Sequence, residues 1–211
     1  MLSAKFQPIR LSRRADPFDS SDFIYEIKHD GFRALACVQA GECQLISRNG
    51  NVFHGFKELS EWIGRRLNVD AVLDGEIVVL DEYGRSQFNY LLFRRGVVHF
   101  YAFDLLSFNG EDLRTLPLIE RKGRLRKLIR RGRSSLLFVD HIEKEGCEFF
   151  RRICELDLEG IVAKRASSSY RITEQPSRDW IKIKNPTYSQ KEGRAELFDE
   201  LQGRATAKAV K

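Results

Sequence analysis

The stretch FIYEIKHDG, residues 23–31, decides the fold of this chain. Its first five residues, Phe23–Ile27, are typical of a strand, and the glycine at position 31 predicts a turn directly after it. Lys28 therefore stands at a strand end, where a side chain can face a cleft. A lysine in such a place is most often a solvated surface residue. A nucleophilic lysine also needs a neutral amine, which nearby cations, a metal ion or desolvation favour.

Two segments further along supply carboxylates next to glycine. Asp74-Gly75-Glu76 precedes an apolar run, and Glu159-Gly160 precedes another. Each acid, taken alone, is most simply a turn residue. Because carboxylate oxygens are the ligands that hard divalent cations prefer, Glu76 and Glu159 together could hold such an ion.

Cations alternate with apolar residues in the segment Trp180–Lys184. On a strand this alternation places Lys182 and Lys184 on one face and the two isoleucines on the other. Like charges on one face need an anion or water. A phosphate surrounded by lysines and a metal ion is the arrangement of phosphoryl or nucleotidyl transfer. The plain alternative is a solvated strand face.

Length and composition set the frame for these motifs. The 211 residues are 42% hydrophobic and include 15 Phe, enough for one domain with a substantial core. Apolar runs stay well short of the ~20 residues of a membrane span, so we expect no membrane contact and a cytoplasmic protein. The net charge of +6 favours an anionic partner without specifying one.

The order of the predicted elements indicates an α+β domain with largely antiparallel sheets. The first 20 residues are expected to be irregular. The predicted strands are Phe23–Ile27, Phe32–Gln39, Gln44–Arg48, Ala71–Leu80, Val97–Leu105, Leu136–Asp140, Gly160–Lys164 and Trp180–Lys184. The predicted helices are Phe56–Leu67, Pro117–Arg131 and Lys144–Leu156. The second helix overlaps Glu120–Arg133, which holds eight basic residues, and the sequence leaves open whether Arg121–Arg133 touches DNA or is a solvated helix face.

Six motifs stand in the order and spacing of the covalent nucleotidyltransferases. They are KHDG at 28–31, SRNG at 47–50, DGE at 74–76, FDLL at 103–106, EGIVAK at 159–164 and WIKIK at 180–184. The chain resembles the adenylation domain of ATP-dependent DNA ligases, and the strings YEIKHDGFR, LDGEIVVLD and EGIVAKR look most like the bacterial end-joining branch. The resemblance implies a covalent nucleotidyltransferase (ATP-grasp-like) fold, with mainly antiparallel sheets flanked by helices. It implies an adenylation domain over residues 1–190, followed by a charged tail over residues 191–211.

The resemblance also implies a role for each motif residue. Lys28 would attack the α-phosphate of ATP and carry AMP. Phe103 would stack on the adenine ring, and Glu26 would contact its edge. The implied ATP- or AMP-binding residues are Glu26, Ile27, Arg33, Arg48, Glu76, Phe103, Val162, Lys182 and Lys184. The implied ligands of Mg²⁺ or Mn²⁺ are Glu76 and Glu159.

The substrate that the resemblance implies is nicked or broken double-stranded DNA, in repair and recombination. Full ligases of this type carry a C-terminal OB-fold, and no motif of that barrel is visible after Lys184. We therefore expect either a separate OB-fold or end-joining protein as partner, or weak activity of the chain alone. Two alternatives stay open: an RNA ligase or capping-type nucleotidyltransferase, and a non-catalytic nucleic-acid-binding module.

Overall fold

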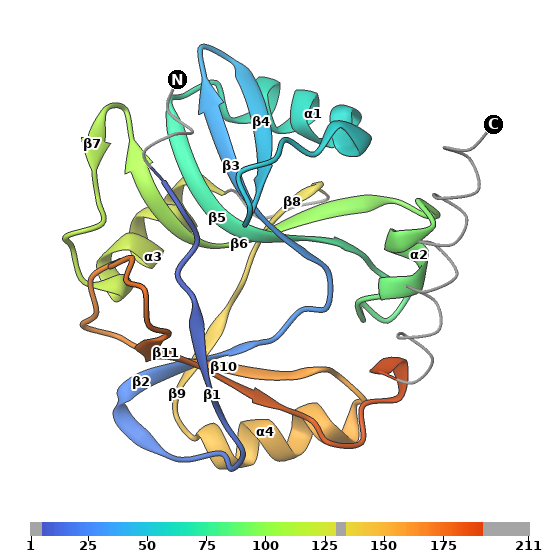
Figure 1. The fold of residues 1–211 in the computed structure, drawn as a ribbon, viewed down its shortest axis with the longest axis vertical. Coiled ribbons are helices and arrows are strands. Elements are labelled where there is room, and N and C mark those ends of the chain that lie inside the picture. The colour runs from blue at the N-terminus through green and yellow to red at the C-terminus, as the bar shows by residue number, and fades with distance from the viewer. Residues whose placement is uncertain (1–5, 130–133, 192–211) are drawn as a thin grey trace.

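Two β-sheets face each other across the middle of the molecule (Figure 1). The structure is a computed structural model that describes residues 6–129 and 134–191. The five-stranded sheet has the order β1-β11-β10-β2-β9, and the six-stranded sheet has the order β4-β3-β5-β6-β7, with β8 paired to β6. The strands of the first sheet are β1 (Leu11–Arg14), β2 (Ser20–Ile27), β9 (His141–Lys144), β10 (Gly160–Arg165) and β11 (Ser177–Lys184). Those of the second are β3 (Phe32–Gln39), β4 (Glu42–Ser47), β5 (Ala71–Val79), β6 (Val98–Phe108), β7 (Glu111–Asp112) and β8 (Leu136–Phe138).

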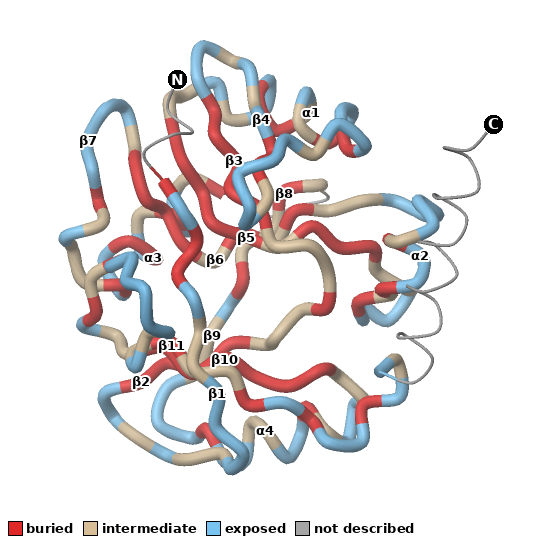
Figure 2. The backbone as a smooth tube through the Cα atoms, in the orientation of Figure 1, coloured by how far each residue is buried: buried red, intermediate tan, exposed pale blue. Residues whose placement is uncertain are grey.

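Helices cover the sheets through apolar positions spaced three or four residues apart. The helices are α1 (Lys57–Leu67), α2 (Phe88–Leu92), α3 (Leu118–Leu128) and α4 (Gly146–Glu155), with short 3₁₀ turns at His54–Phe56 and Ser189–Lys191. On α1, Leu59 and Ile63 reach the core of the six-stranded sheet, as the helical period requires. On α4, Ile153 packs on Tyr25 and Ile183 of the five-stranded sheet. The buried residues accordingly follow the strands of both sheets (Figure 2).

Most of the predicted elements are confirmed, with ends that differ by a few residues. The mixed α+β class and the mainly antiparallel pairing are confirmed as well. The irregular start is a wrong prediction, because Leu11–Arg14 forms β1 and pairs in parallel with β11. The predicted helix 117–131 is shorter than expected, since Ile129 already has an extended backbone. The strands β7 and β9 and the helix α2 were not predicted.

The charged tail lies almost wholly outside the described residues, which end at Lys191. Nothing in the fold therefore tests the predicted boundary between residues 190 and 191. Within the described part, no helix combines the length and the apolar character needed to cross a membrane.

Candidate active site

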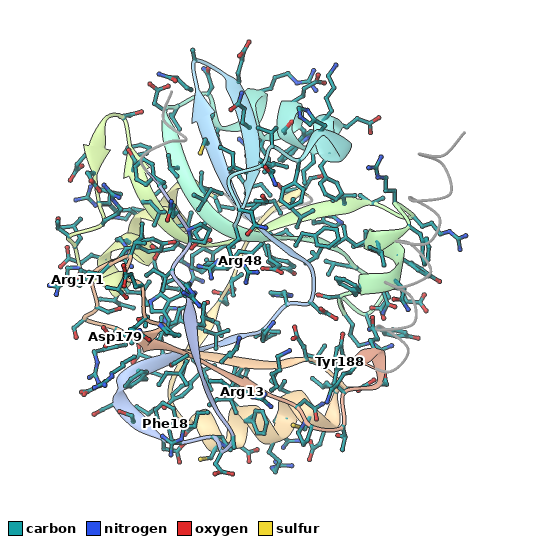
Figure 3. All side chains as sticks on the ribbon, in the orientation of Figure 1. Arg13, Phe18, Arg48, Arg171, Asp179 and Tyr188 are labelled. Carbon is teal, nitrogen blue, oxygen red and sulfur yellow. The ribbon has the colours of Figure 1, made fainter. Side chains whose placement is uncertain are left out.

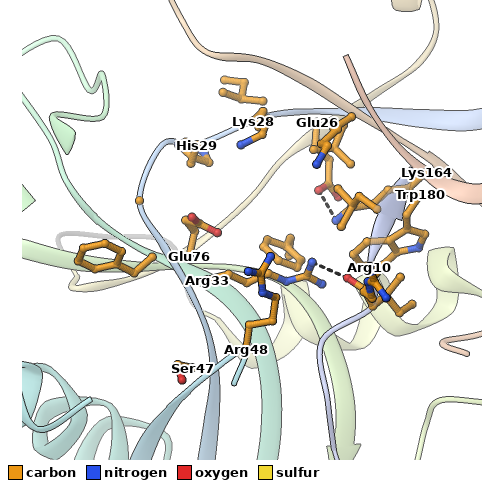
Figure 4. A pocket seen from close by; sticks show the side chains of 18 of the residues that line it. Arg10, Glu26, Lys28, His29, Arg33, Ser47, Arg48, Glu76, Lys164 and Trp180 are labelled. Atoms are coloured by element: carbon orange, nitrogen blue, oxygen red, sulfur yellow. Dashed lines mark hydrogen bonds and ion pairs between the residues drawn. The ribbon is translucent and has the colours of Figure 1, made fainter. Parts of the chain in front are cut away.

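A cavity of about 740 Å³ lies between the two sheets, and both contribute to its lining. Nine of the predicted site residues line it: Glu26, Ile27, Lys28, Arg33, Arg48, Glu76, Phe103, Val162 and Lys182. Figure 3 shows Arg48 in the space between the sheets, and Figure 4 shows Lys28, Glu76 and Arg33 around the same cavity. Residues as far apart in the sequence as Glu26 and Lys182 thus meet in one place.

The register of the five-stranded sheet explains how its residues share one face. Arg13 is the partner of Lys182, Lys182 of Val162, Val162 of Glu26, and Glu26 of His141. Side chains of directly paired residues point to the same side of a sheet, so this row faces the cavity. The alternate residues of β11, Ile181 and Ile183, pack in the cluster beneath α4. The predicted alternation on this strand is therefore confirmed.

Lys28 lies in an ion-pair group at one end of the cavity. Its Nζ atom is 2.6 Å from Glu159 Oε2, and the Nζ atom of Lys184 is 3.1 Å from Oε1 of the same carboxylate. The side chain of Lys28 stays 21% exposed, whereas Glu159 is 7% exposed. Burial alone would raise the pKa of Glu159, but Lys28 and then Lys184 hold it below the ordinary value. Glu159 and Lys28 also line a small neighbouring cavity of about 30 Å³.

Two motif glycines allow the backbone to approach closely around Lys28. A Cβ atom on Gly160 would lie 2.1 Å from the carbonyl oxygen of Ile183, and its φ is +142°. The carbonyl oxygen of Gly160 accepts a 2.9 Å hydrogen bond from the Lys28 amide. A Cβ on Gly31 would lie 2.1 Å from the carbonyl oxygen of Ile77. Because no other residue fits either place, these glycines are structural parts of the site.

Glu76 is a half-buried carboxylate in the same cavity. Burial raises its pKa to about 8, although the positive charges of Lys28 and Arg33 act against this. Glu159 is near enough for its negative charge to raise the pKa of Glu76 further. Over residues 6–129 and 134–191 no group of three or more His, Cys, Asp or Glu could hold a metal ion. A cation at Glu76 and Glu159 therefore needs additional oxygen ligands, and phosphate oxygens suit that requirement.

Arg33 is fixed by contacts within the protein. Its Nε and Nη2 atoms donate to the two oxygens of Asp74, at 3.1 and 2.7 Å, and its Nη1 atom donates to the Ile9 carbonyl at 2.7 Å. The hydroxyl of Tyr170 donates to Asp74 as well, at 2.7 Å. Burial alone would lower the pKa of Arg33. The carboxylate of Asp74 outweighs burial and raises this pKa above its ordinary value. The guanidinium is thus a permanent, immobile positive charge beside Phe103.

Glu26 lies at the other end of the cavity, in a buried group with two lysines. Its carboxylate is 2.6 Å from Lys122 Nζ and 2.5 Å from Lys164 Nζ, and all three side chains are 2% exposed or less. The ammonium of Lys164 also lies 4.1 Å from the ring centre of Phe103 and 4.0 Å from that of Trp180. Burial would raise the pKa of Glu26, but Lys122 and Lys164 lower it.

The basic segment contributes to the interior as well as to the surface. Arg121 is fully buried and pairs with Asp104 at 2.7 Å, and Lys122 pairs with Glu26. For these two residues both predicted alternatives, DNA contact and a solvated face, are wrong. Arg124 and Arg126 form ion pairs with acids at the surface, at 2.7 Å from Glu111 and 3.1 Å from Asp140. Residues 130–133 lie outside the described part of the chain.

Several site residues were missed: three lie in no motif, and His29 lies in the KHDG motif at a position to which the sequence assigned no role. Ile9, Arg10 and Leu11 line the cavity, and they come from the segment that was expected to be irregular. His29 stacks on Tyr101 with ring centres 4.0 Å apart, and burial lowers its pKa to about 4. The only signal in the sequence was the short basic run at residues 10–14, which says nothing about its partner strand.

Comparison with known proteins agrees with this geometry. The family profile described as ATP dependent DNA ligase domain matches residues 1–184. The chain is 34% identical over 179 residues to the multifunctional non-homologous end joining protein LigD of Pseudomonas aeruginosa, covering 77% of this chain and 20% of that protein. It is 34% identical over 173 residues to a DNA ligase of Natronomonas pharaonis, covering 75% of this chain and 31% of the ligase. The chain thus spans a third or less of the length of these two relatives.

Solved structures show the same fold. The ligase domain of LigD from M. tuberculosis superimposes with a TM-score of 0.75 at 27% identity, covering 87% of this chain and 62% of that one. A mycobacterial DNA ligase D complexed with ATP and MES gives a TM-score of 0.72 at 28% identity, covering 85% of this chain and 60% of that one. The motif lysine lines the cavity, and the family profile covers nearly the whole described chain. The chain therefore belongs to the family of ATP-dependent DNA ligase domains.

Proposed function

We propose that this chain is the adenylating part of an ATP-dependent DNA ligase that acts in end-joining repair. The observation that carries the proposal is the position of Lys28, whose amine reaches the cavity next to Glu159, Lys184 and Glu76. A binding module has no need of a part-exposed lysine among paired acids and cations.

In the proposed first step Lys28 is the nucleophile. After losing a proton, its Nζ atom forms a bond to the α-phosphorus of ATP, while the bond from that phosphorus to the bridging oxygen of the β-phosphate breaks. Pyrophosphate leaves, and AMP stays on the lysine as a phosphoramidate. Lys182 and Lys184 supply positive charge where the phosphate oxygens become more negative in the transition state.

The residues Glu76 and Glu159 suit a divalent cation. Mg²⁺ or Mn²⁺ held by these carboxylates would offset the charge of the phosphates. Glu159 has a second part in the step, because it binds the Lys28 ammonium and keeps it at the site. Any interaction that draws Glu159 away from Lys28 makes the proton easier to remove.

The rest of the cavity suits the nucleoside. We assign Phe103 and Val162 to the two sides of the adenine ring and Glu26, with the backbone at Ile27, to its edge. Arg33 and Arg48 are assigned to the ribose and to phosphate. All of these residues line the cavity, which supports the assignment.

In the later steps AMP passes to the 5′-phosphate of nicked or broken DNA, and the 3′-hydroxyl then displaces AMP to seal the strand. We propose that a separate OB-fold or end-joining protein assists these steps, and that they take place in the cytoplasm. We also propose that residues 1–190 form the adenylation domain and residues 191–211 a charged tail.

The test is covalent labelling. The purified chain is mixed with ATP labelled at the α-phosphate and with Mg²⁺ or Mn²⁺, and is then run on a denaturing gel. We expect label on the native chain and none on Lys28→Ala. Absence of label with both metals, also after an OB-fold protein is added, would refute the adenylation. Parallel reactions with nicked DNA and nicked RNA identify the acceptor.

A further inference from the structure

Lys122 is a buried cation that none of the six motifs contains. It lies on α3 with a side chain 1% exposed, and its ammonium donates to three oxygens. These are Glu26 Oε1 at 2.6 Å, the Val139 carbonyl at 2.9 Å and the Phe103 carbonyl at 3.5 Å. An ammonium has three donors, so these contacts use all of them. Lys122 therefore joins β2, β6 and the turn before β9 at the end of the cavity opposite Lys28.

The contacts of Glu26 show what Lys122 does. The side chain of Glu26 is 2% exposed, and burial alone would raise its pKa. Lys122 at 2.6 Å and Lys164 at 2.5 Å lower that pKa instead. The pair of lysines thus keeps a deeply buried carboxyl ionised.

Lys122 and Lys164 are the two cations that lower the pKa of Glu26. His141, its partner in the sheet, has a pKa lowered by burial and by Lys122. His29 has a pKa of about 4, again because of burial. Both imidazoles are therefore neutral at pH 7, and Glu26 depends on Lys122 and Lys164 for its charge.

We propose that Lys122 is a positioning residue for base selection: it holds the Glu26 carboxylate ionised, so that this end of the cavity accepts a purine with an exocyclic amino group and rejects one with a carbonyl oxygen there. The inference rests on the proposed adenylation. An ionised carboxylate only accepts hydrogen bonds, so it binds the 6-amino group of adenine and repels the 6-oxygen of guanine. A protonated carboxyl can donate a hydrogen bond to that oxygen, so the site would no longer discriminate between adenine and guanine.

The experiment compares labelling by ATP and by GTP. Rates of lysine labelling are measured at several concentrations of each nucleotide for the native chain and for Lys122→Met, which has a similar length but no charge. We expect the preference for ATP to fall about tenfold or more, since a site loses selectivity when its polar group changes from acceptor to donor. Lys122→Arg, which restores the positive charge, should recover part of the preference.

Arg121→Met is the matched control. Arg121 is the next residue of the same helix, is equally buried and also pairs with a single carboxylate, that of Asp104. Asp104 does not line the cavity, and its charge favours the ammonium form of Lys164, so this variant removes a buried ion pair while it leaves both lysines of Glu26 in place. We expect its preference for ATP to equal that of the native chain. Melting temperatures of both variants show how much of each effect is structural.

Three results decide the matter. An unchanged preference in folded Lys122→Met, or an equal loss in Arg121→Met, would overturn the inference while native labelling still supports the adenylation. No labelling of the native chain would instead refute the proposed function. If Lys122→Met does not fold, Lys122→Gln replaces it, because its amide can still donate to the Val139 carbonyl, and the same outcomes apply.

Discussion

The two ends of the cavity hold charge in different ways. The proposed base end is the group of Glu26, Lys122 and Lys164, and the proposed phosphate end is the group of Lys28, Glu159 and Lys184. At the base end, Glu26 and its lysines are 2% exposed or less, and every donor of Lys122 has an acceptor. At the phosphate end, Lys28 is 21% and Lys184 is 44% exposed, and both share one carboxylate. Breaking a buried ion pair is costly, so the base end is rigid. The phosphate end can exchange partners, which a nucleophile requires.

The largest effect is expected at the centre of the phosphate end. Lys28→Ala and Lys28→Arg should both abolish labelling with α-labelled ATP, because neither side chain supplies a nucleophilic amine. The arginine variant keeps a cation beside Glu159 and so separates nucleophilicity from charge. Both variants are read on a denaturing gel. Label on either of them would mean that another residue is the nucleophile, and that the end of the cavity around Lys28 is not the reacting end.

Removing the shared carboxylate comes next. Glu159→Gln should slow labelling about 100-fold or more, since it removes both a proposed metal ligand and the partner of Lys28 and Lys184. Glu143→Gln, an exposed acid on β9, is the control and should label at the native rate. A similar small loss in both variants would mean that the ion pair at the phosphate end is not part of the reaction.

The two glutamates should respond to pH with opposite signs. The pKa of Glu76 rises from 4.5 to about 8 on folding, so the folded chain favours its protonated form and loses stability as pH rises between these values. Glu76→Gln removes this loss, and its melting temperature should exceed the native value by about 5 °C at pH 8.5, with little difference at pH 4.5.

Glu26 has a lowered pKa, so its contribution to stability is present at neutral pH and is lost as pH falls through the folded value. Glu26→Gln should therefore melt below the native chain at pH 7, with a difference that shrinks in acid. Melting curves of both variants, taken from pH 8.5 down to values below pH 4.5, check the pair of predictions. Equal behaviour of the two variants would contradict the contrast between the two ends.

The smallest effect is expected at the edge of the sheet. Arg13 pairs in register with Lys182 and adds positive charge next to it. Arg13→Ala should raise the KM for ATP about threefold, and less at high salt, because an exposed charge is screened. Arg14→Ala is the control, since its guanidinium lies 4.5 Å from the ring centre of Phe18 instead. Equal KM values in the two variants would mean that the charge of Arg13 does not contribute to ATP binding.

How far the sequence predicts this site depends on the distance along the chain. Lys28, Glu76, Glu159 and Lys182 were predicted because each lies in a short motif whose strand pattern orients it. Lys122 could not be predicted, because its partner Glu26 is 96 residues away and Lys122 stands in a run of basic residues that gives no sign of which of them are buried. The basic pattern of that segment predicts a helix but not which cations meet buried acids.

The first strand was missed for a similar reason. Leu11–Arg14 has four residues and no clear alternation, so only its pairing with β11 makes it a strand. Ile9, Arg10 and Leu11 line the cavity because this same segment lies beside β11, so no local pattern in the sequence predicts their position. Local sequence patterns predict the secondary structure of a segment well, but they do not predict which distant segment it pairs with.

The parallel pairing of β1 with β11 also sets the order of folding. It joins residues 11–14 to residues 177–183, and the amide of Ile9 donates to the hydroxyl of Tyr170, 161 positions away. Contacts of such long range form late and slow the folding of a domain. During synthesis, β11 leaves the ribosome long after β1, so the strand that carries Lys182 and the wall formed by residues 9–11 are completed last. A nascent chain can therefore hold the six-stranded sheet well before it can hold a nucleotide.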